Sequence, residues 1–190
     1  MKLTKGCFGY LNAKKKWETL KTVIYFALPA AIFLMGYYTT GTKKNLLTVV
    51  AVLGCLPASK SAVSLIMYLK AGVCSGSCHE TLQECGLERG DTLLLYDLYL
   101  TSYEKNFQIS ALAIKNNAVC GYTEDGRCDV GAGEKHIAEI LRQSGYEGLT
   151  VKLFTDLSKF ADRLAQMNDT AEKKEEKEKA IAGILKDISL

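Results

Sequence analysis

The sequence predicts an α+β protein in which a two-helix transmembrane hairpin precedes a small cytoplasmic domain, a meandering sheet of about four strands packed by helices. Two observations support this division. Hydrophobic residues make up 48% of the 190 residues, and the long uncharged runs lie before Lys70. From Lys70 onward the chain instead alternates short apolar segments with turn residues, as soluble domains do.

Two uncharged segments near the N-terminus predict the hairpin. The first, residues 22–40, has no charged side chain, and the second, residues 45–69, contains a single lysine, Lys60. Because a helix rises about 1.5 Å per residue, each segment is long enough to cross a hydrocarbon core of about 30 Å. We therefore expect a transmembrane hairpin over residues 22–69.

Pro57 and Lys60 make the second segment unusual and leave two readings open. In the first, the helix ends near Leu56, Pro57 turns the chain, and residues 61–69 lie in the membrane interface with Lys60 among the headgroups. In the second, the span is continuous and kinked, and Lys60 marks an ion path or a contact with a partner subunit. We favour the first, because a lysine at the centre of a span costs about 2.5 kcal/mol or more.

Charge distribution predicts the orientation. The leader, residues 1–21, holds six lysines and one acidic residue, Glu18. The positive-inside rule then places the N-terminus and the C-terminal domain of this multi-pass cell-membrane protein in the cytoplasm. The seven cysteines are an odd number, which argues against a disulfide framework and fits a reducing compartment. The net charge of +3 gives no strong signal for nucleic-acid binding.

The soluble domain is predicted over residues 80–167, after a linker over residues 70–79 that leads into a helix. Three segments rich in Leu, Ile and Tyr are joined by short loops, which predicts an antiparallel meander. A charged amphipathic helix, docked or self-associating, is expected over residues 168–190. The other expected elements are strands at 92–102, 107–114, 118–123 and 149–154, and helices at 134–144 and from 155 to 167.

No catalytic or cofactor motif stands out in the domain, and we predict neither. Four potential soft ligands fall within twelve residues, but their spacing matches no standard zinc knuckle, so we predict thiols of a linker and no metal site. Gly131 and Gly133 open a helix and are candidates for an anion-binding turn, although the Gly-Lys-Ser/Thr of a phosphate loop is missing. The four potential soft ligands are Cys74, Cys78, His79 and Cys85.

Three consecutive strand segments resemble the central sheet of restriction-endonuclease-like domains, including the nuclease-related domains attached to some bacterial membrane segments. The similarity covers residues 80–165. The family cleaves nucleic acid with an acidic residue on one strand and a Glu-x-Lys on the next, which hold a divalent metal. Ser110, Gly121 and Thr123 occupy the corresponding positions, so the resemblance implies a catalytically inert copy. The segments are Leu94–Leu100, Gln108–Ile114 and Ala118–Thr123.

These features lead us to expect a non-enzymatic, membrane-anchored cytoplasmic module that binds or scaffolds a protein partner, with the lipid bilayer as its other partner. The spans and the C-terminal helix also allow a homo-oligomer. Pro57 and Lys60 motivate a first alternative, a subunit of a small oligomeric channel or transporter. The second alternative is a nucleic-acid-processing enzyme with an unrecognised site that would involve Asp97 or Glu124.

Overall fold

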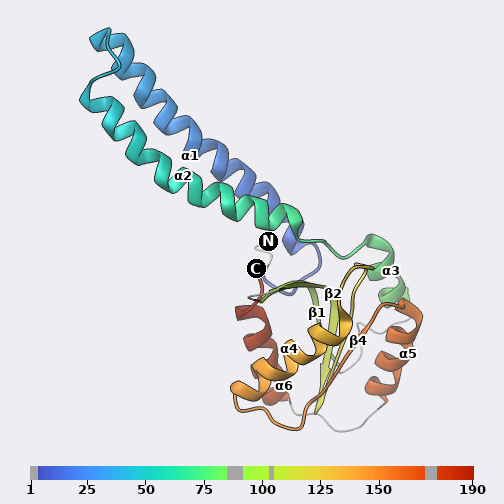
Figure 1. Cartoon of the computed structure of the whole chain (residues 1–190). Coiled ribbons are helices and arrows are strands. Elements are labelled where there is room, and N and C mark those ends of the chain that lie inside the picture. Colours follow the sequence, from blue (N-terminus) through green and yellow to red (C-terminus); the bar gives the residue numbers. More distant parts are fainter. Residues whose placement is uncertain (1–3, 85–91, 103–104, 170–174) are drawn as a thin grey trace. The chain divides into compact units, whose positions relative to one another are not determined.

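The computed structural model describes residues 4–84, 92–102, 105–169 and 175–190. The chain divides into two compact units, one formed by residues 11–71 and the other by the N-terminal residues up to Tyr10 together with residues 72–190. Two long apolar helices make up the first unit, and a four-stranded mixed sheet packed by helices makes up the second (Figure 1). The predicted α+β class is therefore confirmed.

The helical unit contains α1 (Tyr10–Thr40) and α2 (Leu46–Lys70). Asn45 caps α2, because its side-chain oxygen accepts a hydrogen bond from the Thr48 backbone N–H at 2.8 Å. Helix α2 passes through Pro57 and Lys60 without a break. The reading in which the helix ends near Leu56 is therefore incorrect, and the helix is continuous from Leu46 to Lys70. Proline removes one backbone hydrogen bond, which the flanking turns of a long helix can tolerate.

Close contacts fix the register of α1 against α2. Near one end, the hydroxyl oxygens of Thr22 and Ser61 lie 2.8 Å apart. Near the other end, a Cβ added to Gly36 would lie 2.8 Å from the Leu47 Cβ. The two helices therefore run antiparallel in a constant register: moving one residue forward along α1 corresponds to moving one residue backward along α2. The residues that are buried on α2 are all small, which lets the two backbones approach closely: Ala51, Ala58 and Ser61.

The second unit is built on a sheet with strand order β1-β2-β3-β4. The first three strands pair antiparallel as the predicted meander, whereas β4 pairs parallel with β3. Helix α4 (Val130–Gln143) connects β3 to β4, since a parallel pair needs a crossover. The strands are β1 (Leu93–Thr101), β2 (Asn106–Lys115), β3 (Ala118–Tyr122) and β4 (Thr150–Phe154).

Helices cover both faces of the sheet (Figure 1). Side chains alternate along β2, so that Leu112 and Ile114 belong to one apolar cluster and Ala111 and Ala113 to the other. The first cluster includes residues of α4 and α6, and the second includes residues of α3 and α5. The C-terminal helix is therefore docked on the domain. The helices are α3 (Gly76–Glu84), α4 (Val130–Gln143), α5 (Leu157–Asn168) and α6 (Glu175–Asp187).

The beginning of the chain is part of the domain. The Tyr96 backbone N–H donates to the Gly6 carbonyl at 2.9 Å, and Lys5 Nζ donates to the Ser189 carbonyl at 2.7 Å. The expected leader over residues 1–21 is thus divided, because Lys5, Gly6 and Gly9 bond to the domain whereas residues from Tyr10 onward belong to α1. The two apolar helices precede the sheet in the chain, as predicted, and a short N-terminal segment of the domain precedes them.

Candidate functional site

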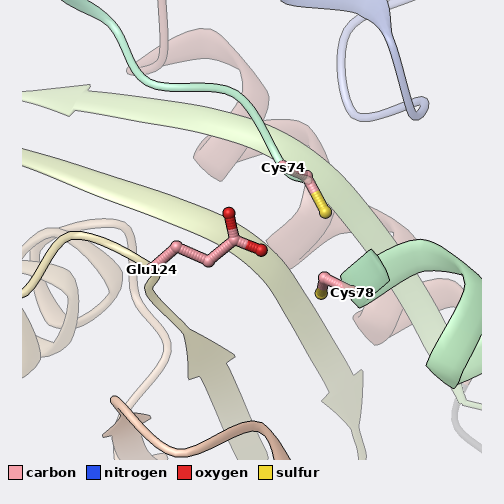
Figure 2. Close-up of side chains that lie close together, drawn as sticks. All are labelled: Cys74, Cys78 and Glu124. Carbon is pink, nitrogen blue, oxygen red and sulfur yellow. The ribbon is translucent and has the colours of Figure 1, made fainter. Parts of the chain in front are cut away.

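Three ligand-type side chains come together where the chain enters the domain after α2 (Figure 2). Cys74 lies in the segment before α3, Cys78 lies in the first turn of α3, and Glu124 follows the end of β3. The two sulfur atoms and a carboxylate oxygen all lie within 4.8 Å of one another. Both cysteines are buried and Glu124 is half-buried, so this is a partly enclosed cluster with two thiols and one carboxylate.

Ser75 holds Glu124 at the N-terminus of α3. Its hydroxyl donates to Glu124 Oε1 at 2.7 Å, and its backbone N–H lies 3.2 Å from Oε2. The same hydroxyl oxygen accepts the Cys78 backbone N–H at 3.2 Å and so caps the helix. The partial positive charge of a helix N-terminus favours a carboxylate at this place. Ser75 therefore positions both the Glu124 carboxylate and the first turn of the helix that carries Cys78.

Asp97 is a second acidic group beside the cluster. Its Oδ1 accepts the Cys74 backbone N–H at 2.7 Å, and its Oδ2 accepts the Gly9 backbone N–H at 2.9 Å. Asp97 is 3% exposed and has a φ of 56°, in the left-handed region that aspartate visits more often than most residues. One buried carboxylate thus fixes both the segment that precedes α1 and the segment that follows α2. The only signal in the sequence was a charge inside an apolar strand.

The environment keeps the Cys74 thiol protonated. The hydrogen bond with Cys78 and then burial raise the pKa of Cys74, and the nearby negative charges of Glu124 and Asp97 raise it further. A reactive cysteine needs a lowered pKa, because the thiolate is the nucleophile. The arrangement therefore does not suit nucleophilic catalysis at Cys74. It offers instead two sulfur ligands and one oxygen ligand of the kinds that bind zinc.

The other predicted soft ligands do not join this cluster. The His79 ring stacks on Phe8, with ring centroids 4.0 Å apart, and meets Tyr96 edge to face at 5.3 Å. Cys85 lies outside the described residues. Of the four residues that lie close in sequence, the structure places Cys74 and Cys78 side by side, and it adds Glu124 from the end of a distant strand.

The predicted anion-binding turn has a packing role. Helix α4 begins at Val130, before Gly131, and its N-cap Asp129 accepts the Ala132 N–H at 3.0 Å. A Cβ on Gly133 would lie 2.8 Å from Leu153 Cδ1, so glycine allows the helix to approach β4. The Asp129 carboxylate already occupies this helix end, and its negative charge would repel an anion there.

The three positions that correspond to the nuclease motif serve the fold. The Ser110 hydroxyl accepts the Glu124 backbone N–H at 3.3 Å. The Thr123 backbone N–H donates to the Phe154 carbonyl at 2.9 Å, which extends the pairing of β3 with β4. A Cβ on Gly121 would lie close to Leu153. The resemblance to restriction-endonuclease-like domains stays a prediction.

A polar cavity of about 250 Å³ lies beside the turn between β2 and β3, with Lys115 and Arg163 in its lining. Lys115 is buried and its Nζ donates to the Asn168 carbonyl at 3.2 Å. Arg163 donates to Gln166 Oε1 at 3.1 Å. Both cations are therefore engaged within the fold.

No protein-family model matches this chain, and no curated protein or solved structure matches it either.

Proposed function

We propose that this protein is a membrane-anchored binding or scaffold module, with a hairpin that crosses the bilayer and a cytoplasmic domain that binds a protein partner. The support is the surface of the helical unit. Both helices are long and apolar enough to cross a membrane, and only 17% of the most apolar window of each is buried. Large apolar side chains such as Leu28 and Leu53 are about 60% exposed. Lipid is the environment in which such a surface is stable.

The register of the hairpin supports an anchor over a channel. Because Thr22 lies level with Ser61, Lys60 lies level with Val23, beside the Lys21 end of the uncharged part of α1. Residues 22–40 would span about 28 Å, which is close to the hydrocarbon thickness. Lys60 would therefore sit among the headgroups and not at the bilayer centre. The continuous helix and an interfacial lysine are compatible.

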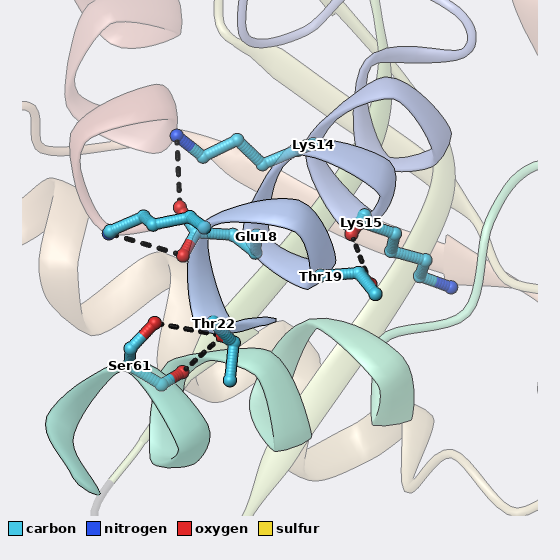
Figure 3. Close-up of polar contacts among 7 residues, drawn as sticks. Lys14, Lys15, Glu18, Thr19, Thr22 and Ser61 are labelled. Atoms are coloured by element: carbon cyan, nitrogen blue, oxygen red, sulfur yellow. Dashed lines mark hydrogen bonds and ion pairs between the residues drawn. The ribbon is translucent and has the colours of Figure 1, made fainter. Parts of the chain in front are cut away.

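The part of α1 before Thr22 has the character of a membrane interface. Glu18 is almost fully buried and forms ion pairs with Lys14 at 3.6 Å and Lys21 at 3.3 Å, one turn away on either side (Figure 3). Trp17 is 60% exposed, as expected for a ring at headgroup level. The excess of lysines at this end supports a cytoplasmic location for the domain.

The polar groups of the domain favour a binding role over catalysis. Asp97 accepts backbone N–H groups from the segment that leads to α1 and from the segment that follows α2, and Glu124 accepts the N–H and hydroxyl of Ser75. These carboxylates hold backbone in place, which suits a domain that presents a fixed binding surface. Helix α6 buries its apolar face on the sheet, so a homo-oligomer would form through the spans.

Membrane insertion and the side of the membrane on which the domain lies are tested with full-length protein in bacterial membranes. We expect the chain to resist extraction by alkaline carbonate, with the domain digested by protease in inside-out vesicles and protected in intact spheroplasts. Extraction by carbonate, or digestion of the domain in spheroplasts, would overturn the proposal.

The depth of Lys60 in the membrane is tested with two variants, one that removes this lysine and one that places a lysine near the middle of the span. Lys60→Leu should insert as the wild type does and leave ion flux across reconstituted vesicles at the background of empty vesicles. Val52→Lys, which puts a lysine near the middle of the span, should lower insertion at a cost of about 2.5 kcal/mol or more. Equal insertion of both variants would contradict the register argument, and a wild-type flux that Lys60→Leu abolishes would favour the channel.

Partner binding is tested by native mass spectrometry of the full-length protein extracted from its own membrane. A defined complex with a second protein is the expected result. Only the bare chain or a homo-oligomer, at every detergent tested, would contradict the recruitment role.

A further inference from the structure

We propose that Cys74, Cys78 and Glu124 bind one zinc ion, with a water molecule as the fourth ligand. The three residues come from separate places in the sequence, yet their ligand atoms lie within 4.8 Å of one another. Tetrahedral zinc, with bonds of about 2.3 Å to sulfur and about 2.1 Å to oxygen, places ligand atoms roughly 3.5–3.8 Å apart. Closing the cluster by about 1 Å, through side-chain rotation, is enough to reach this geometry.

The ligand types select zinc over hard cations. Two sulfur ligands disfavour magnesium and calcium, which bind oxygen, and suit zinc, which accepts both sulfur and carboxylate oxygen. Glu124 forms no ion pair with a lysine or arginine in the described part of the chain. With Asp97 close by, negative charge accumulates around Cys74. A divalent cation would compensate this charge.

Neighbouring groups hold the ligands in place, as is usual around protein-bound zinc. The Ser75 hydroxyl and N–H both bond to the Glu124 carboxylate, which orients it toward the two thiols. The Cys74 N–H bonds to Asp97, which fixes the backbone of that ligand. Cys78 lies in the first turn of α3, and its backbone N–H donates to the Ser75 hydroxyl at 3.2 Å, which fixes the backbone of this ligand.

Binding would exchange protons for the metal. Each thiol loses its proton as its sulfur bonds to zinc, so one bound ion releases two protons, and the affinity increases with pH. Cys74 is the third residue after Ala71, the last residue of the helical unit. Zinc would therefore fasten the segment that enters the domain to the end of β3, and the inference does not depend on whether the hairpin spans a membrane.

The test uses full-length protein in detergent, reduced and stripped of metal, and titrated with Co²⁺ as a spectroscopic probe. We expect thiolate-to-cobalt charge-transfer absorption that saturates at one equivalent and disappears when Zn²⁺ is added. Cys78→Ser should remove about half of this absorption and lower the affinity at least about 100-fold, and Glu124→Gln should lower it at least about tenfold while the absorption stays. The control Cys128→Ser removes a thiol outside the cluster and should bind as the wild type does.

Three results would overturn the proposal. The first is absorption that never saturates at one equivalent. The second is a loss of affinity in Cys128→Ser as large as in Cys78→Ser, which would mean scattered thiol binding. The third is the absence of metal uptake by reduced protein whose far-ultraviolet circular dichroism is native. The same spectrum, measured for each variant, separates loss of the site from loss of the fold.

Discussion

Replacing Asp97 by asparagine tests whether one buried carboxylate holds in place the two segments that flank the helical hairpin in the sequence. The asparagine side chain has the size of the native one and tolerates the φ of 56° at this position. It offers only one oxygen, however, whereas the carboxylate accepts both the Gly9 and the Cys74 N–H groups. The amide nitrogen of the variant would face the second backbone N–H. Both groups are donors, so that hydrogen bond would be lost.

The expected cost follows from the burial of this residue. Asp97 is 3% exposed, so an N–H that loses its acceptor there is not rescued by bulk water. A buried donor left unpaired costs about 1–3 kcal/mol, and hydrogen bonds to charged groups lie at the upper end. A loss of about 2 kcal/mol in the free energy of local unfolding corresponds to roughly a 30-fold increase in the equilibrium constant for opening of the affected segment.

Hydrogen exchange measured by mass spectrometry on the full-length protein reports this opening directly. In Asp97→Asn, we expect the amides of peptides around Gly9 or Cys74 to exchange roughly 30-fold faster, while those of α4 change little. Asp162→Asn makes the same chemical change on the exposed side of α5 and serves as the control. Unchanged exchange at both segments in Asp97→Asn would refute the role assigned to this carboxylate.

Other predictions address the hairpin and the half-buried His136. The double variant Thr22→Cys/Ser61→Cys should form an intramolecular disulfide on mild oxidation, seen as a gel shift, because the hydroxyls lie 2.8 Å apart; a Thr22→Cys single variant should not. Gly36→Ala should destabilise the hairpin by about 1–3 kcal/mol in detergent unfolding, because its Cβ would lie 2.8 Å from the nearest Cβ of α2, whereas Gly183→Ala, with open space around it, should not destabilise the chain. Burial lowers the pKa of His136 below 6.5, so the unfolded chain takes up a proton first and stability falls as the pH drops through this range. His136→Phe should lessen this loss between about pH 7.5 and about pH 5.5 in urea unfolding, and an unchanged pH dependence would contradict the assignment.

Local patterns in the sequence predicted most elements of the fold. The meander was predictable because alternating apolar residues and short loops act between neighbours in the chain, as in the strand expected at 107–114 and found at Asn106–Lys115. The two apolar helices were predictable for the same reason, since length and the absence of charge are local properties. Helix α1 begins earlier than expected, at Tyr10, because the lysine-rich leader is also a good helix former.

Composition alone could not determine how α2 passes Pro57. A proline and a lysine within one turn fit a broken helix and a continuous one equally well. The contacts of Ser61 with Thr22 and of Gly36 with Leu47 settle which residues lie at the same level, and these depend on the fit of two helix surfaces.

Residue patterns were enough to divide the chain into an apolar hairpin and an α+β domain and to place the strands in order along it. Three further features emerged from packing: the N-terminal residues join the domain, β4 pairs parallel with β3, and Glu124 meets two cysteines about fifty residues before it. These features depend on contacts between segments far apart in sequence. Such contacts form only when the whole set of apolar faces is buried together, so no local pattern encodes them.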